Sequence, residues 1–373
     1  MSVPKTRLFT SESVCAGHPD KICDAISDAI VDAALSQDPS SRTGIETVAG
    51  ANQIALFGEI KTTAKLDFET IARQKVKDLG YSVPAWGFSH ESIFSNDIHE
   101  QSPEIAIGVN HDGAGDQGMM FGFACNETPE LMPLPIMLAH SIARRIDEAR
   151  EKGELKWLRP DGKTQVTVRY QNDKPVAIEK LVAAVAHDEQ TDPKQVRLDV
   201  IKSIFAPVLE NYKFKLPDDQ DITVNGTGLW HIPGPESDAG LTGRKIVIDT
   251  YGGYAHVGGG CFSGKDPSKV DRSGAYAARF IAKNIVAAGL ATKCEVGLAY
   301  VIGKPEPLMQ TIDTFDTAKV SERELKDFKD KLIDTSVRGI IERLDLRRPI
   351  YSQTAAYGHF GKPGLPWEQV VSA

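Results

Sequence analysis

The chain has 373 residues, of which 41% are hydrophobic and 25% charged, an ordinary composition for a globular protein of two or three domains. Lys and Arg number 43 and Asp and Glu 51, and the net charge of −8 argues against a nucleic-acid binder. No run of apolar residues is long enough for a membrane span, and the first seven residues lack a signal peptide's apolar core. Five cysteines without a CxxC pair favour a reduced protein. We therefore expect a cytoplasmic protein that binds neither membrane nor nucleic acid.

The first predicted helix covers residues 17–37. Apolar residues recur at helical spacing from Ile22 to Ala33, and Pro19 suits the first helical position. A second face carries acidic residues at every fourth position. Asp20 stands apart because it lies at the helix start beside His18, whereas the other three fit a solvated acidic face: Asp24, Asp28 and Asp32.

Further elements follow from apolar periodicity and from turn residues. We expect strands at 46–60, 119–125, 164–171, 175–186, 221–225, 244–250 and 294–302. We expect helices at 66–79, 134–152, 192–210, 268–288 and 321–343. The hairpin signal Asn172-Asp173 joins two of the strands, and residues 81–118 read as a long polar loop with one short strand near 104–109.

Mixed strands and helices recur about three times along the chain, roughly every 110 residues. This recurrence predicts an α+β (mixed α/β) architecture with three units of similar size. We place the domains at 1–101, 113–230 and 232–373.

Residues 113–118 (GAGDQG) match the pattern GxGxxG. A dinucleotide site needs a helix after this pattern, whereas the residues that follow, 119–123, are strand-like. We therefore interpret the segment as a glycine-rich turn before a strand. Asp116 inside it offers a carboxylate to an amine. Met119 and Met120 in the strand-like stretch are expected in the core.

Residues 259–265 (GGCFSGK) match GxxxxGK, but Asp266 follows where a phosphate loop needs Ser or Thr for Mg²⁺. The wider segment 240–272 holds eight of the 32 glycines and a local excess of Lys and Arg. Backbone N–H groups and Lys265 would suit a polyphosphate there. A flexible surface loop with ordinary lysines fits the segment equally well.

His18, Pro19 and Asp20 open the first helix with an imidazole and a carboxylate. A helix N-terminus favours a bound anion, and Asp20 could hold a Mg²⁺ that bridges to that anion. Simple capping of the helix explains the same residues.

Together these segments resemble the S-adenosylmethionine synthetase (methionine adenosyltransferase) family of bacterial type. Two signatures are nearly whole, GAGDQGMMFGF at 113–123 and GGGCFSGKDPSKVDRS at 258–273. The likeness covers nearly the whole chain. Further matching segments are FTSESVCAGHPDKICDAISDAI at 9–30, KWLRPDGKTQVTVRY at 156–170, DAGLTGRKIVIDTYGG at 238–253 and TAAYGHFG at 354–361.

The resemblance implies three α/β domains with pseudo-threefold symmetry and subunits that pair through flat sheet faces, as a homodimer or a dimer of dimers. It implies active sites between subunits that use ATP, L-methionine and water to make S-adenosylmethionine, phosphate and pyrophosphate. The methionine sulfur attacks the ribose C5′, and the tripolyphosphate that leaves is then hydrolysed. Such a step depends on positioning and on electrostatic stabilisation of the leaving group, and needs no acid–base triad.

The resemblance also implies a cation-rich nucleotide site. His18 lies near the ribose and triphosphate, and Asp161 lies in the nucleotide site. Trp230 would stack on adenine, and Cys261 belongs to the ATP-binding loop. The expected polyphosphate contacts are Lys163, Arg244, Lys245 and Lys265.

The implied methionine contacts are Glu59, Gln101, Asp116, Asp238 and Lys269, of which Asp238 also contacts the nucleotide. Two Mg²⁺ ions and one K⁺ ion are expected as cofactors in each site. The implied metal ligands are Asp20 and Asp271 for Mg²⁺ and Glu46 for K⁺. The catalytic set is His18, Lys163, Arg244, Lys245, Lys265 and Lys269.

The chain departs from the family pattern at three places. Leu229-Trp230 stands where Arg-Phe is common, Cys261 replaces an alanine, and the stretch 101–113 is short. The sequence leaves two alternatives to the synthetase function open. Another ATP-dependent phosphotransferase would release ADP, and a non-catalytic regulatory homologue would be expected to lack some of the charged site residues.

Overall fold

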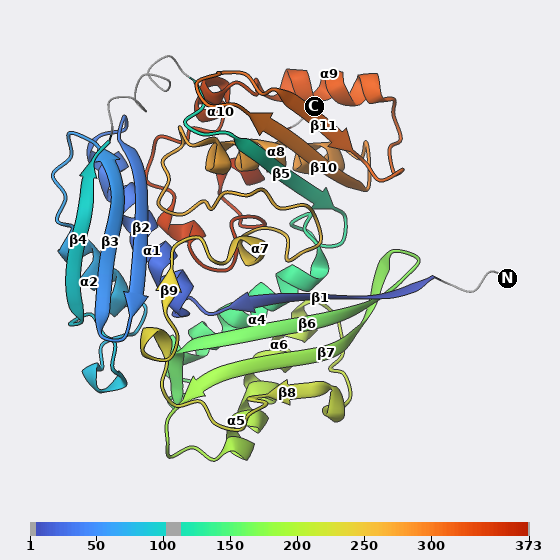
Figure 1. Ribbon diagram of the computed structural model, residues 1–373. Coiled ribbons are helices and arrows are strands. Elements are labelled where there is room, and N and C mark those ends of the chain that lie inside the picture. Colours follow the sequence, from blue (N-terminus) through green and yellow to red (C-terminus); the bar gives the residue numbers. More distant parts are fainter. Residues whose placement is uncertain (1–4, 102–112, 372–373) are drawn as a thin grey trace.

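The computed structural model describes residues 5–101 and 113–371, which form a mixed α+β fold with three β-sheets (Figure 1). Sheet I has the strand order β4-β3-β2-β9, sheet II β1-β6-β7-β8, and sheet III β11-β10-β5. The strands are β1 Thr6–Val14, β2 Arg42–Gly50, β3 Gln53–Lys61, β4 Ile93–Glu100, β5 Gly118–Cys125, β6 Leu158–Gln171, β7 Lys174–His187, β8 Ile222–Val224, β9 Gly240–Leu241, β10 Lys293–Tyr300 and β11 Met309–Asp313.

The order of elements repeats along the chain as strand, helix, antiparallel hairpin and helix. The three hairpins are β2–β3, β6–β7 and β10–β11. In the first two repeats a closing strand follows, and β4 and β8 run parallel to the second strand of their hairpin. The helices are α1 Pro19–Gln37, α2 Phe68–Asp78, α4 Leu134–Glu151, α5 Pro193–Val200, α6 Ala206–Asn211, α7 Ile246–Asp249, α8 Val270–Ala287, α9 Glu322–Leu332 and α10 Val337–Arg343. This recurrence confirms the expected three-unit α+β architecture.

The opening strand of each repeat does not stay with its own hairpin. Strand β1 pairs with β6 in sheet II, β5 pairs with β10 in sheet III, and β9 pairs with β2 in sheet I. In Figure 1 the dark-blue β1 accordingly lies along the green sheet. The three sheets are therefore linked in a ring, each completed by a strand from another part of the chain.

Helices cover one face of each sheet. Helix α1 packs on β2, α4 on β1 and β6, and α8 on β5 and β10. The α1 stripe predicted from periodicity is buried, with Ile22, Ile26 and Ile30 fully enclosed. Helix α8 is buried along nearly its whole length and lies in the largest hydrophobic core. None of the helices in the described ranges combines the length and apolar character that a bilayer span requires.

Several expected elements are confirmed, and some boundaries move. The expected strand 46–60 is the hairpin β2–β3, and the 192–210 helix runs as α5, a π-helical turn Ile201–Phe205 and α6. Asn172 and Asp173 form the predicted hairpin turn with φ of +48° and +59°, the left-handed values that such turns need.

Three predictions about local structure are wrong. The segment 244–250 is no strand, because it contains the short helix α7, and the nearby strand β9 has only two residues. Met119 was expected in the core, yet its side chain is 54% exposed, whereas Met120 is buried. The expected strand near 104–109 lies outside the described residues. Within the expected loop 81–118, residues Ile93–Glu100 form strand β4, so the loop prediction is wrong there.

Candidate functional site

His18, Asp20, Arg244 and Lys245 converge at the start of α1, and we call these four residues the Asp20 cluster. His18 is the N-cap of α1, and its Nδ1 accepts a hydrogen bond from the Asp20 N–H at 3.2 Å. The Asp20 carboxylate accepts one from the Leu241 N–H at 3.0 Å and one from Lys245 Nζ. Arg244 Nε lies 3.7 Å from Asp20 Oδ1. Two cations from the glycine-rich segment thus face the helix N-terminus.

The electrostatics of this cluster fix two protonation states at neutral pH. Burial and the neighbouring Lys245 lower the pKa of His18 to about 3, so its imidazole is neutral. Burial raises the pKa of Asp20, but the hydrogen bonds from Lys245 and Leu241 outweigh burial and hold the pKa below its ordinary value. Asp20 is therefore ionised.

The second group of predicted residues lies on the loop before α8, where Lys265 and Asp271 face each other. Lys265 Nζ donates to Asp271 Oδ2 at 2.8 Å. Although burial lowers the pKa of Lys265, the charge of the Asp271 carboxylate and its hydrogen bond help to raise the pKa above its ordinary value, so the ammonium persists. Gly260 is required beside them, since a Cβ there would lie 1.9 Å from Asp271 Oδ1.

A third contact brings Lys269 to the end of β3. Lys269 Nζ lies 3.7 Å from Glu59 Oε1, which also accepts a hydrogen bond from Gln101 Nε2 at 2.9 Å. Gln101 Oε1 is buried and has no hydrogen-bond partner within the described ranges. The Gly115 N–H donates to the Ser268 carbonyl at 3.3 Å, so the 113–118 turn packs on the same loop.

Strand β6 supplies Asp161 and Lys163. Asp161 is buried, and its Oδ2 accepts a hydrogen bond from the Gly234 N–H at 2.8 Å. Its Oδ1 is enclosed without a partner among the residues that the structure describes. Burial raises the pKa of Asp161 to about 7, against the opposing effects of Gly234 and Lys163. Lys163 is exposed, and its charge lowers the pKa of His18, which places it near the Asp20 cluster.

The other predicted residues are less closely connected. Trp230 is half-buried and donates through Nε1 to the Ile232 carbonyl at 2.9 Å. Asp238 is exposed, and its N–H donates to the Gly234 carbonyl at 3.3 Å. Asp116 is exposed and accepts from the Gln117 N–H at 2.8 Å. The structure therefore does not bring the side chains of Trp230 and Asp238 into hydrogen-bonded contact with the lysines.

Glu46 and Cys261 both lie near Lys265. Burial raises the pKa of Glu46, and the charge of Lys265 opposes that shift. Burial also raises the pKa of Cys261, to about 11, so this residue is a neutral thiol at physiological pH. A Cβ on Gly243 would lie 2.4 Å from Cys261 Cβ, so the Asp20 and Lys265 ends of the segment are in close contact.

The acidic row of α1 was predicted to face solvent, and that prediction is wrong. Asp24 and Asp28 are fully buried. Asp24 accepts hydrogen bonds from Lys21 Nζ at 2.9 Å and from the Gly243 N–H at 2.8 Å. Asp28 accepts two from Arg272, at 2.7 and 2.9 Å, and one from the Gly264 N–H at 2.9 Å.

Asp32 completes the row by accepting from the N–H groups of Tyr351 and Ser352, at 2.9 and 2.7 Å. The acidic face of α1 therefore holds the backbone of the glycine-rich segment and of the C-terminal region. The sequence analysis did not predict this role. The sequence did contain a signal, because acidic residues recur at every fourth position in α1 and a separate segment of the chain is rich in glycine N–H donors.

The donor set bears on the predicted metal ions. Within the described ranges, no group of three His, Cys, Asp or Glu side chains is arranged to hold a metal ion. Mg²⁺ needs only one or two carboxylates when phosphate oxygens and water complete its shell. Asp20 and Asp271, each paired with a lysine, fit that kind of shared site.

Comparison with known proteins gives a consistent result across the chain. Three family models match, namely the S-adenosylmethionine synthetase N-terminal domain over residues 6–103, the central domain over 111–230 and the C-terminal domain over 232–369. Two curated proteins called S-adenosylmethionine synthase, from two strains of Staphylococcus epidermidis, are each 50% identical over 383 aligned residues. Each alignment covers 98% of this chain and 96% of the relative.

Proposed function

Because this chain belongs to the S-adenosylmethionine synthetase family and is a methionine adenosyltransferase, we propose that its site performs the two-step reaction expected from its motifs. ATP and L-methionine bind together, and the methionine sulfur attacks the ribose C5′. The tripolyphosphate that leaves is hydrolysed to pyrophosphate and phosphate. The products are S-adenosylmethionine, pyrophosphate and phosphate.

One observation carries the proposal: the glycine-rich segment brings Arg244, Lys245 and Lys265 to the N-terminal side of α1 and to Asp271. A thioether is a neutral, weak nucleophile, so the barrier falls chiefly when the highly charged leaving group is stabilised. Fixed cations supply that stabilisation without reorganising in the transition state. Because Nδ1 of the neutral His18 imidazole accepts from the Asp20 N–H, Nε2 carries the ring proton and can donate a hydrogen bond to a ribose oxygen without adding a charge that would repel the nearby cations.

The methionine subsite in this proposal consists of Glu59, Gln101, Asp116 and Lys269, with Asp238 at its border with the nucleotide. Gln101 Oε1 and Glu59 offer acceptors to an ammonium group, and Lys269 offers a cation to a carboxylate. Asp161 and Lys163 extend the nucleotide site from β6, and Trp230 offers a ring to adenine.

Two Mg²⁺ ions, when bound, would neutralise part of the triphosphate charge. Asp20 and Asp271 would hold them. Glu46 would hold K⁺ near Lys265, where burial already disfavours an unpaired carboxylate. Lys245 pairs with Asp20, and Lys265 pairs with Asp271. A Mg²⁺ ion bound to either carboxylate would compete with the paired lysine, and that lysine would then be able to turn toward a phosphate.

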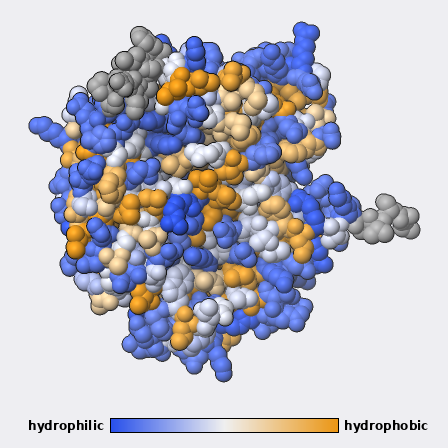
Figure 2. All heavy atoms as spheres, viewed as in Figure 1, coloured by the Kyte–Doolittle hydropathy of each residue, from blue (hydrophilic) through white to orange (hydrophobic). Residues whose placement is uncertain are grey.

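We further propose that two copies pair through sheet faces, with each active site completed at that interface. Large hydrophobic side chains are exposed on the sheets and adjoining loops, among them Phe57, Met119, Leu229, Leu241 and Ile302. Figure 2 shows hydrophobic residues spread among hydrophilic ones on the face that carries the sheets. Burial of such surface would stabilise a dimer.

The test is a product analysis. Purified protein is mixed with ATP, L-methionine, Mg²⁺ and K⁺, and S-adenosylmethionine, pyrophosphate and phosphate are measured together. The proposal predicts equal amounts of all three. ADP with a phosphorylated acceptor would instead identify a phosphotransferase, and folded protein without any product would identify a binding or regulatory homologue.

A further inference from the structure

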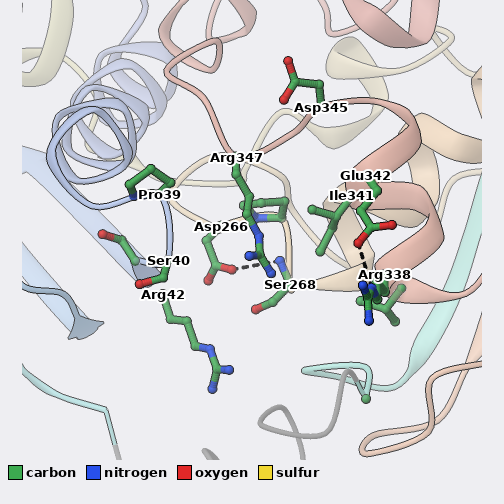
Figure 3. A pocket seen from close by; sticks show the side chains of 14 residues that line it. Pro39, Ser40, Arg42, Asp266, Ser268, Arg338, Ile341, Glu342, Asp345 and Arg347 are labelled. Atoms are coloured by element: carbon green, nitrogen blue, oxygen red, sulfur yellow. Dashed lines mark hydrogen bonds and ion pairs between the residues drawn. The ribbon is translucent and has the colours of Figure 1, made fainter.

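A cavity of about 520 Å³ lies between the start of β2, the helix α10 and the turn 266–268 (Figure 3). This volume is in the usual range for small-molecule sites. None of the residues assigned above to ATP, methionine or metal ions lines it. The cavity is therefore a second concave site, and its wall chemistry indicates what it can bind.

Two enclosed polar groups of this wall have no partner in the described part of the chain, and an exposed arginine lies in the same wall. Arg42 is half-buried, and its Nη1 is enclosed without a hydrogen bond. The hydroxyl of Ser268 is enclosed in the same way. Arg347 is exposed, and Figure 3 shows its side chain pointing toward the turn that contains Asp266 and Ser268. Enclosed donors without acceptors are costly, so an acceptor from a ligand would be stabilising.

The acidic residues of the wall do not neutralise these arginines. Asp266 accepts hydrogen bonds from the N–H groups of Thr43 and Ser268, both at 2.8 Å, and pairs with Lys269. Glu342 accepts from Arg338 at 2.7 Å.

Asp345 pairs with Arg348 at 3.2 Å, outside the cavity wall. Each carboxylate thus has a cationic partner other than Arg42 and Arg347. The lining holds three arginines and three carboxylates, and because these carboxylates have other partners, the guanidinium groups of Arg42 and Arg347 stay available to an anion.

We propose that this cavity binds a small organic anion that carries a phosphate or carboxylate group on an apolar body. The guanidinium groups of Arg42 and Arg347 and the Ser268 hydroxyl would recognise the acidic group. Pro39, Pro267, Val337 and Ile341 line the same cavity and would contact the apolar body. The proposal does not depend on the reaction proposed above, because binding here can be measured without catalysis.

The test uses phenyl phosphate and benzoate as anionic probes and benzyl alcohol as a neutral probe of similar size. Binding to the whole chain is measured by calorimetry and by ligand-observed NMR. At least one anion should bind saturably, and benzyl alcohol should not. The stronger of the two anions identifies the acidic group that the site prefers.

Substitutions locate the binding. Arg42→Gln and Arg347→Gln should each weaken the preferred anion by about tenfold or more, since each removes a charge-assisted hydrogen bond. Arg323→Gln is the control, because Arg323 is exposed, pairs with Asp327, and neither residue lines the cavity. It should leave the affinity unchanged. Arg42→Lys keeps the positive charge and separates loss of this charge from misfolding. It should bind the preferred anion more tightly than Arg42→Gln does.

Three results would overturn the proposal. The first is the absence of saturable binding by both anions. The second is an equal loss of affinity in Arg323→Gln, which would indicate a general surface effect. The third is loss of binding in Lys245→Ala with full binding in Arg42→Gln, which would place the probe in the Asp20 cluster instead.

Discussion

Lys245 and Lys265 are each paired with a carboxylate, Asp20 and Asp271 respectively. This pairing holds the two half-buried ammonium groups in a fixed orientation. A polyphosphate provides competing anionic oxygens at the same two places. Asp20 and Asp271, which pair with the two lysines, are also the residues that we propose as metal ligands. When the polyphosphate and the metal ions bind together, the lysines would pair with phosphate oxygens and the carboxylates with the metal ions, so each charge keeps a partner.

Lys265→Ala should lower the rate of S-adenosylmethionine formation by at least about tenfold. The change removes a fixed charge that stabilises the leaving group, and a tenfold loss corresponds to about 1.4 kcal/mol of transition-state stabilisation. Steady-state rates at saturating ATP and methionine measure the effect. Lys194→Ala is the control, because Lys194 is exposed at the start of α5. Near-normal turnover of Lys265→Ala would show that the residue is peripheral.

Asp161→Asn should change how stability depends on pH. The pKa of Asp161 is raised to about 7, so the folded protein keeps a proton that the unfolded chain releases near pH 4. The contribution of Asp161 to the free energy of unfolding therefore falls as pH rises between these values, by up to about 1.4 kcal/mol per unit. Asparagine keeps an acceptor for Gly234 and carries no charge.

Urea unfolding of both proteins from about pH 5 to pH 7.5 tests this linkage. The stability of Asp161→Asn relative to the unmodified protein should rise across that range. A constant difference between the two proteins would mean that Asp161 is ionised in the fold at the lower pH.

At the scale of single elements, α1 shows what sequence can and cannot provide. The apolar stripe, Pro19 and the helix range follow from periodicity and from the geometry of proline. The destination of Asp24 and Asp28 does not, because a row of acids at every fourth position is compatible with solvent as well as with buried partners. Those partners, Gly243, Gly264 and Arg272, are more than 200 residues away in the chain.

Two neighbouring glycines, Gly259 and Gly260, allow a matched test of how the glycine-rich loop packs on Asp271. Gly260→Ala would place a Cβ 1.9 Å from Asp271 Oδ1, so Asp271 must move away from Lys265. We expect at least about a tenfold loss in the rate of S-adenosylmethionine formation, since small displacements of catalytic groups are costly. Gly259→Ala, with no atom within 4 Å of the added Cβ, should keep the normal rate. Equal rates for the two variants would contradict the tight packing of this loop on Asp271.

At the scale of the whole molecule, the three sheets are linked because each takes a strand from another repeat. Sequence predicted three mixed units, and the resemblance to a family predicted their symmetry. The exchange of β1, β5 and β9 was not predictable, because strand pairing between distant segments leaves no trace in local periodicity. The same limit explains why the predicted strand at 244–250 is wrong. Its short apolar run is compatible with a helical turn as well as with a strand, and the structure has the short helix α7 there.

This linkage predicts cooperative unfolding. No sheet can be lost without removing a strand partner from another repeat, so the described fold should melt as one unit. Differential scanning calorimetry should give a single transition whose calorimetric and van 't Hoff enthalpies agree per cooperative unit. Separate transitions for three independent regions would contradict the inference that the exchanged strands couple the three sheets.

We propose that this chain transfers an adenosyl group from ATP by breaking the bond between C5′ and its oxygen. ATP labelled with ¹⁸O at the oxygen between C5′ and the α-phosphorus tests it most directly. Mass spectrometry after a single turnover with methionine should find the label in the released phosphates and none in S-adenosylmethionine. Label retained in the adenosine-containing product, or release of ADP, would show that a phosphorus–oxygen bond is broken and would contradict the assignment.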